Sequence, residues 1–497
     1  MQIEYPCREN TGVIFPKKLL YTTSPFSSRR IKHTVALGWT FVMYEFDTSF
    51  IDIFIFAFLF AFSVGNAQSF LSIYNFNHVN QNLMVNPASP HNYKLVVGVP
   101  GLGGLSTHVN NKNLVSFLEK DGDPNENLGN AINQLKPEDR INTTQSLDGI
   151  FVGFKSSKGY WTISAQQKTD FNMTMPGEML KFLYFGNAGS GYVGKTLDLS
   201  NFNIEAIVRN EYGIGYQHKI DSNLIIGGRF KYISGVSNIY TQRFNASIYS
   251  DIENINVNTD ILLNTSGIYN GILDTDDIVG YYSGSAFSKN TGMGFDLGVY
   301  YKINKRFDVS GSILNLGWIK WNKDLKGLEV KGDFDFYGVE GSFPFDSLDF
   351  GGFLDSTVSR IEVNEVDINS YSTTLPSHFI LSGQFYANEK NVFGLLYQGS
   401  FWNDRLYSNY GVMYNGRYSK WFNLTLGYSV IDNSLNNVTL GASVRLGAFQ
   451  IYALTDNTFG FLNPSEIVAT NVRAGVTISI LDSPKNNKSK SKSKSKN

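Results

Sequence analysis

Alternating apolar and polar positions dominate the chain, most clearly in residues 291–321, TGMGFDLGVYYKINKRFDVSGSILNLGWIKW. Within 295–303 the large apolar side chains occupy every second position, with polar or small residues between most of them. A period of two predicts a β-strand with one apolar and one polar face. Residues 304–306 form a short turn, and a second alternating strand follows and ends in Trp318 and Trp321. Two such strands on a tight turn are typical of a hairpin in a membrane β-barrel.

The same alternation recurs along most of the chain. Its runs are often ten residues or longer, which exceeds the five or six residues usual for strands of soluble proteins. We therefore predict an all-β fold, a transmembrane antiparallel barrel of about 14 strands, an even number as in single-chain barrels. The expected strands include 145–171 with a central turn, 203–219, 222–241, 377–387, 391–402, 407–418, 420–431, 436–447, 448–456 and 468–481.

The connections between these strands are expected to be unequal. Residues 244–290 and 322–375 are rich in Asp, Asn, Ser, Gly and Thr and have a weaker period, so we predict long loops on one side of the barrel. Residues 112–136 have helical spacing, which predicts one or two short helices in a loop or a plug.

The two ends of the chain differ from the rest. Residues 53–64, IFIFAFLFAFSV, are too short to span a bilayer as a helix and are followed by small residues, which predicts a secretory signal cleaved near Ala67. A buried core helix or a membrane anchor is the alternative. The predicted organisation is an N-terminal extension with signal peptide (1–67), a barrel (68–481) and a disordered Lys/Ser tail (482–497).

Composition supports strands and excludes several classes of function. Aromatic residues make up 14% and charged residues only 17%, and the net charge of −1 gives no field that would attract nucleic acid. The mean hydropathy of −0.16 suits strands that are only half apolar. The only cysteine, Cys7, precedes the predicted cleavage site, so no disulfide, thiol chemistry or cysteine metal site is expected in the exported part.

One stretch matches a nucleotide-binding motif. Residues 189–196, GSGYVGKT, fit the phosphate-cradling pattern GxxxxGK[ST]. That mechanism needs a helix directly after the loop, whereas residues 196–200 continue with alternation. We expect a chance match in a glycine-rich loop and no bound nucleotide.

No metal or catalytic constellation is complete. Residues 121–127 place oxygen side chains at alternate positions, as calcium loops do, but Glu126 and Ile132 stand where glycine and an acidic residue are required. Asp274, Asp276 and Asp277 form a weaker candidate. The histidines form no HxxxH pair, and GxSxG is missing from the sequence. We therefore predict no catalytic, cofactor-binding or metal-binding residue and no enzyme.

Four tryptophans lie at or near the ends of predicted strands. Trp318, Trp321, Trp402 and Trp421 are therefore expected in the aromatic girdles where a barrel meets lipid headgroups. Ordinary packing in a soluble β-sandwich is the alternative.

Three stretches resemble a known family: GFDLGVYYKINKRFDVSGSILNLGWIKW within 291–321, LGASVRLGAFQIYALTDN at 440–457, and Asn-Pro-Ala at 86–88. They resemble an uncharacterised outer-membrane barrel family of Bacteroidota, akin to PorV, PorP/SprF and FadL-like barrels. The resemblance implies the outer membrane of a Gram-negative bacterium. It implies no catalytic residue.

Two functions remain open from the sequence. The first is a non-enzymatic channel or FadL-like carrier for a small or hydrophobic solute. The second is a membrane anchor or accessory component of a secretion, motility or surface complex, which would use 244–290 and 322–375 as docking surface. The expected partners are outer-membrane lipid and, for the second function, surface or secretion-complex proteins. Nucleic acid and nucleotide are not expected.

Overall fold

The computed structural model describes residues 71–76, 78–91, 93–102, 104–111, 124–135, 140–189, 191–251, 254–268, 285–336, 363–403, 405–431, 434–458 and 469–481. The predicted signal segment, Asp274, Asp276, Asp277 and the Lys/Ser tail lie outside these residues.

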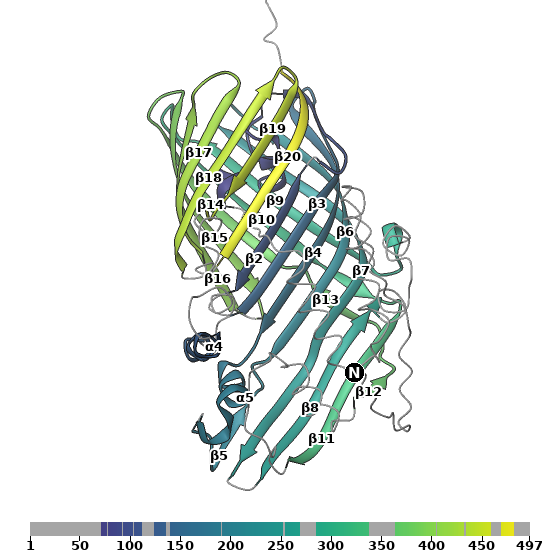
Figure 1. Ribbon diagram of the computed structural model, residues 1–497. Helices are drawn as coiled ribbons and strands as arrows, with labels where there is room; N and C mark the ends of the chain where they lie inside the picture. Colours follow the sequence, from purple (N-terminus) through teal and green to yellow (C-terminus); the bar gives the residue numbers. More distant parts are fainter. Residues whose placement is uncertain are drawn as a thin grey trace, which may run out of the picture.

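Strands account for most of the described chain (Figure 1). They are β1 Tyr93–Gly98, β2 Leu105–Asn111, β3 Arg140–Lys155, β4 Gly159–Thr174, β5 Lys195–Asp198, β6 Asn203–Lys219, β7 Leu224–Ser250, β8 Ile255–Ser266, β9 Thr291–Lys302, β10 Phe307–Trp321, β11 Leu325–Phe336, β12 Asn364–Val366, β13 Tyr371–Thr374, β14 Ser377–Tyr386, β15 Asn391–Trp402, β16 Arg405–Arg417, β17 Phe422–Ile431, β18 Ser434–Leu446, β19 Phe449–Thr455 and β20 Ala469–Leu481. The helices are α3 Leu71–Tyr74, α4 Pro124–Asn133 and α5 Gly177–Gly189, with 3₁₀ turns η1 Asn80–Met84 and η3 Ser285–Phe287. None of the described helices is long and apolar enough to cross a membrane.

Antiparallel pairing closes the wall of a barrel. Its order is β1 with β2, then β3, β4, β6, β7, β9, β10 and β14 to β20. The last strand, β20, pairs with both β1 and β2, which share one position in the wall because both also pair with β3. This arrangement gives the wall 14 positions, so the prediction of a barrel of about 14 strands is confirmed.

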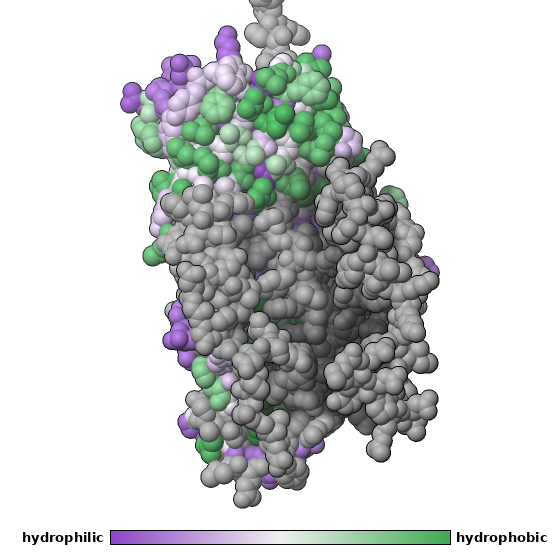
Figure 2. Space-filling model, in the orientation of Figure 1, coloured by the Kyte–Doolittle hydropathy of each residue, from purple (hydrophilic) through white to green (hydrophobic). Residues whose placement is uncertain are grey.

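The outer face of the wall is apolar. On β9 the exposed side chains include Phe295, Leu297 and Val299, while Asp296 faces inward and is buried. From Met293 to Ile303 the strand rises about 33 Å, or about 25 Å along the axis at a tilt of about 40°, which matches the apolar band of membrane barrels. Figure 2 shows hydrophobic residues gathered over the upper part of the wall, where β17 to β20 lie.

The two ends of the barrel differ. Short hairpin turns such as 303–306 and 387–390 join the strands at one end, whereas the longer connections, which include α4, α5 and β8, lie at the other. At this second end β7 continues beyond its pairing with β9 and pairs with β5 and β8, and β8 pairs with β11. These strands form the extension at the bottom of Figure 1.

The extension corrects the prediction of long loops at 244–290 and 322–375 for the parts that the structure describes, whereas residues 269–284 and 337–362 lie outside the described residues. These ranges contain the end of β7 together with β8, β11, β12 and β13. One face of β8 packs Ile261 and Leu263 into a hydrophobic core shared with Phe171 and Leu197. The other face is polar, and there Asn256 donates a hydrogen bond to Asp335 at 3.0 Å. The Asn- and Asp-rich composition therefore belongs to the solvent face of a sheet.

The predicted helix in 112–136 is present as α4, but it does not form a plug. It packs against α5, and a Cβ placed on Gly129 would lie 3.0 Å from the Tyr184 ring. The interior of the barrel instead contains residues 71–91, the segment that directly precedes β1. Because this segment leads straight into the wall, it reaches the lumen without any long connection.

Candidate functional site: a plugged lumen

Residues 71–91, named the plug here, fill the interior of the barrel. Ile73 and Phe76 are fully buried and belong to a hydrophobic cluster with inward side chains of six wall strands, among them Leu314 and Ile380. The described Ser, Asn and Gln side chains of the plug are also buried, and they face an inner wall lined with hydroxyl and amide groups. A buried amide without a hydrogen bond is costly, so most of the plug amides need partners; the side chain of Asn82 is an exception and has none within the described residues.

Amide side chains attach the plug to opposite parts of the wall. The Asn75 side-chain oxygen accepts hydrogen bonds from Ser382 Oγ at 2.7 Å and from Gln384 Nε2 at 3.0 Å. Asn80 Nδ2 donates to Gln450 Oε1 at 3.0 Å and to Thr477 Oγ1 at 3.1 Å. Further bonds to plug carbonyls come from Gln217 (Ala88 and Ser89), Ser312 (Val85) and Gln450 (His78).

The Asn-Pro-Ala turn at 86–88 sits in a notch made by two glycines. Gly227 of β7 and Gly298 of β9 are directly paired across the two strands. A Cβ on Gly227 would lie 2.3 Å from the Pro87 carbonyl oxygen, and one on Gly298 would lie 2.3 Å from Asn86 Oδ1. Since no real Cβ tolerates such distances, the plug can occupy this position only while both residues are glycine.

An ion-paired arginine holds the middle of the plug. Arg229 of β7 donates to the carbonyl oxygens of Leu83 at 2.6 Å and Met84 at 3.2 Å. It also pairs with Asp296 of β9 at 3.0 Å, and Lys231 lies 2.7 Å from the same carboxylate. Hydrogen bonds to charged groups are the strong ones, about 1.5–3 kcal/mol each, so Arg229 is the strongest attachment of the plug.

The ion pairs continue along the inner wall, away from the plug. Glu211 lies within 3.0 Å of Lys168, 2.8 Å of Arg209 and 3.5 Å of Lys231. Arg209 also pairs with Asp170. With Arg229 and Asp296 the network has four cations and three carboxylates, all with buried side chains except the partly exposed Lys168. Removing one member of such a network costs about 3–5 kcal/mol, because a buried charge loses its partner.

A second set of contacts crosses the lumen near the extension. Trp402 at the end of β15 donates its indole N–H to Glu205 of β6 at 2.8 Å, although four strands separate the two along the wall. The Arg140 guanidinium of β3 lies 3.4 Å above the Tyr407 ring of β16, again across the barrel. We call these the cross-lumen contacts. They close the lumen at the end opposite the short turns.

The structure corrects two of the four tryptophan predictions. Trp321 is fully buried and donates to Thr373 Oγ1 at 3.0 Å, and Trp402 makes the cross-lumen contact, so neither faces lipid. Trp318 and Trp421 are exposed on the outer surface, at 46% and 57%. Their place in membrane-interface girdles stays a prediction.

The candidate motifs do not assemble into a site. In the stretch 189–196 the strand β5 begins at Lys195, and no helix follows the glycines to hold a phosphate. The calcium-like stretch 121–127 lies partly outside the described residues. Within the described parts of the chain no group of three or more His, Cys, Asp or Glu side chains could hold a metal ion.

These features define the class: a 14-stranded antiparallel barrel whose lumen contains its own plug. The chain belongs to DUF5723, a family of unknown function, whose family model matches residues 87–456. A comparison with curated proteins finds no significant match.

The solved structures that this chain matches include two toluene transporters and a FadL homologue. The Pseudomonas putida toluene transporter TodX has a TM-score of 0.39 and 11% identity, over 80% of this chain and 93% of that one. The Ralstonia pickettii toluene transporter TbuX has a TM-score of 0.39 and 9% identity, over 84% and 96%. A Pseudomonas aeruginosa FadL homologue has a TM-score of 0.34 and 9% identity, over 78% and 90%. Similarity at this level carries no argument about solute or mechanism.

Proposed function

We propose that this chain is an outer-membrane barrel that acts as a gated channel or carrier for a small or hydrophobic solute. The observation that carries the proposal is the plug, a segment held in the lumen by hydrophobic packing and by hydrogen bonds from the wall. A barrel that served only as a rigid support could fill its interior with wall side chains. A lumen closed by a separable segment can open by a shift of that segment.

The membrane location rests on the outer face of the wall. Large apolar side chains are exposed on most wall strands, including Leu395 at 65% and Leu381 at 56%. In water such a continuous surface would lead to aggregation, whereas a bilayer covers it. The inner face is polar, so inside and outside are reversed relative to a soluble barrel.

Opening requires the plug to leave its attachments. Arg229 can release the carbonyls of Leu83 and Met84 without an orphaned carboxylate, because Lys231 also neutralises Asp296. A wall that stays ion-paired after the plug departs is suited to repeated opening. The cross-lumen contacts would then have to part as well for a solute to pass.

The experiment is conductance in planar bilayers with purified full-length protein. Arg229→Gln removes the main attachment, and Trp402→Phe removes the cross-lumen hydrogen bond. Arg243→Gln is the matched control, because Arg243 lies on the same strand but pairs with Asp260 in the extension at 2.7 Å. We expect Arg229→Gln with Trp402→Phe to raise conductance at least tenfold, and Arg243→Gln to leave it unchanged. A double variant that keeps its heat-modifiable fold but remains sealed would reject the channel.

The second candidate, an anchor for a surface or secretion complex, is favoured by the extension. Its sheet has a hydrophobic core of its own beyond the barrel and presents a polar face with Arg243, Asp260 and Glu329 in ion-pair contact. A stable sheet outside the membrane offers a surface to a protein partner. Partner capture that persists in a sealed barrel and is lost after charge reversal at Lys331 and Asp333 would support this function.

A further inference from the structure

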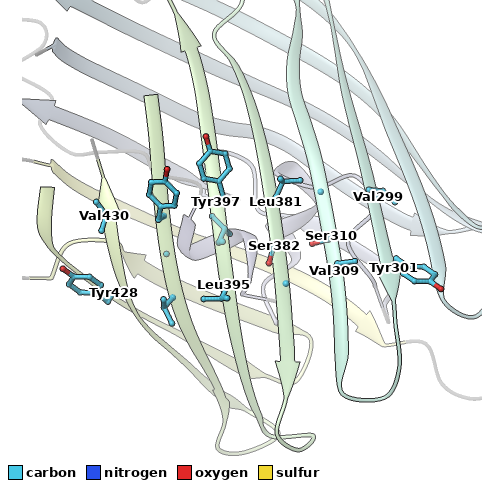
Figure 3. A pocket seen from close by; sticks show the side chains of 16 residues that line it. Val299, Tyr301, Val309, Ser310, Leu381, Ser382, Leu395, Tyr397, Tyr428 and Val430 are labelled. Atoms are coloured by element: carbon cyan, nitrogen blue, oxygen red, sulfur yellow. The ribbon is translucent and has the colours of Figure 1, made fainter. Parts of the chain in front are cut away.

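A groove of about 800 Å³ is cut into the outer face of the barrel wall between β9 and β17 (Figure 3). Its floor contains Gly311 of β10 and Gly383 of β14, two outward positions where the wall has no side chain. A Cβ on Gly383 would meet no atom closer than 4.0 Å, so the space there is open. The volume falls in the range of about 300–1,000 Å³ typical of small-molecule sites.

The groove is apolar and lies at mid-height on the wall. Its sides include Leu381, Leu395 and Val412, all more than half exposed, and the rings of Tyr397 and Tyr410. These residues lie near the middle of β14, β15 and β16. The groove therefore belongs to the lipid-facing band, and this inference rests on the membrane location proposed above.

The plug supports the groove from inside. Ser382 borders the groove and its Oγ donates to Asn75 of the plug at 2.7 Å. The next inward residue on the same strand, Gln384, donates to the same oxygen at 3.0 Å. Because the wall is bonded to a packed interior at this point, its floor cannot move outward and flatten the depression. The groove is thus a preformed feature of the folded barrel.

Basic turns lie at the end of the barrel toward which the groove strands β9 and β10 lead. The β9–β10 turn carries Lys305 and Arg306, the β14–β15 turn carries Lys390, and the β16–β17 turn carries Lys420, all exposed. Within the described chain none of them forms an ion pair with a carboxylate, and Glu389 is the one acidic residue in these three turns. Unpaired cations at a membrane surface attract anionic headgroups.

We propose that the groove and the basic turns form a binding site for one anionic glycerophospholipid, with an acyl chain in the groove and the phosphate at Lys305 and Arg306. Apolar surfaces gain nothing from association within hydrocarbon unless they pack well. A rigid concave wall leaves voids against a rigid partner, whereas a flexible acyl chain can follow it. The charge at the turns selects the headgroup. In outer-membrane barrels short turns face the periplasm, so the lipid belongs to the inner leaflet.

Native mass spectrometry of the full-length barrel in mild detergent with added phosphatidylglycerol tests the site. Gly383→Phe fills the groove, and Gly228→Phe is its control, because Gly228 also faces outward with no atom closer than 3.8 Å but lies on β7. Lys305→Glu reverses a charge in the β9–β10 turn. Its control is Lys158→Glu, which makes the same change in the turn between β3 and β4. We expect one retained lipid per wild-type barrel, with at least fivefold weaker retention in Gly383→Phe and Lys305→Glu only.

Other outcomes overturn the site. Equal retention in all five proteins would mean that lipid binds nonspecifically. A dimer that Gly383→Phe dissociates would identify a second copy of the chain as the occupant. Retention of phosphatidylcholine as strong as that of phosphatidylglycerol would refute the role of the basic turns. Heat-modifiable mobility and recovery from the membrane fraction are measured in parallel, so a failure of the lipid site is distinguished from a failure of the membrane location.

Discussion

The glycine notch allows the plug to be displaced without any change of charge. Gly227→Ala adds one methyl group that would lie 2.3 Å from the Pro87 carbonyl oxygen and 2.8 Å from the Ala88 nitrogen. Gly228→Ala makes the same change one residue further on the same strand, where the nearest atom lies at 3.8 Å. The two variants have the same composition and the same strand propensity, so they differ only in the contact with the plug.

The expected magnitude follows from the contacts. Overpacking by one methyl group costs about 1–3 kcal/mol, which weakens the seated plug and leaves a displaced plug unaffected. The population of displaced plug should therefore rise by about 5–150-fold. Ten hydrogen bonds between side chains and the plug remain, at about 1 kcal/mol each, so most molecules still hold the plug in place.

Thiol labelling measures this population. Asn82 is 1% exposed and its side chain makes no hydrogen bond within the described residues, so Asn82→Cys introduces a buried probe with little loss of contact. Combined with Cys7→Ser it is the only thiol of the chain. Maleimide should react 5–150 times faster in the Gly227→Ala protein than in wild type, and at the wild-type rate in Gly228→Ala. Equal rates in all three proteins, with barrels intact by heat-modifiable mobility, would refute a plug seated against Gly227.

Three further predictions concern other parts of the molecule. If the cross-lumen contacts are a second barrier, the single variants Trp402→Phe and Gly227→Ala should each leave conductance low. The fold-increase in conductance of the double variant should then exceed the product of the two single fold-increases. A double variant whose increase equals that product would show that there is only one barrier. In single-tryptophan variants, brominated lipids should quench Trp318 and Trp421 at least twofold more than Trp321 and Trp402; strong quenching of Trp321 would contradict its burial. Near the extension, hydrogen bonds from Lys181 and Tyr192 hold the pKa of Glu178 below its ordinary value. The contact therefore stabilises α5 at any pH above the pKa that Glu178 has in the unfolded chain. This stabilisation is lost as the pH falls through the lower pKa that Glu178 has in the folded protein. Amide exchange in α5 should therefore accelerate in acid in wild type, and Glu178→Gln should flatten this response.

The sequence predicts the wall well because alternation there has one physical cause. Every wall strand separates an apolar outer side from a polar interior, so residues such as Phe295 and Asp296 reveal their faces directly. The same alternation governs the extension, where the described parts of the predicted loops contain strands such as β8 and β11. Ile261 and Leu263 alternate as wall residues do, but the Asn- and Asp-rich composition around them is also typical of loops and masks their period. In such a sheet the Asn and Asp residues occupy the solvent face, so the composition does not reveal the buried apolar face.

The tryptophan errors could have been avoided by parity. Trp318 and Trp321 are three residues apart on one strand, so they must point to opposite faces, and only one of them can face lipid. Likewise Trp402 follows Phe401, which is 52% exposed on the outer face, and so must point inward. Position at a strand end was a weaker signal than the face that each residue occupies.

The plug could not be predicted from the lining of the lumen, because hydroxyl and amide groups on the inner wall suit water and an amide-rich segment equally well. Gln450 can donate to a water molecule as readily as to the carbonyl of His78. A water-filled lumen and a plugged lumen differ only at inward positions that have no side chain. Gly227, Gly298 and Gly394 all face inward, and a Cβ on each would lie 2.3–2.6 Å from a plug atom. A water-filled channel has no need of such space, so inward glycines on neighbouring wall strands, combined with an Asn-Pro-Ala turn ahead of the first strand, are the features that specify an occupied lumen.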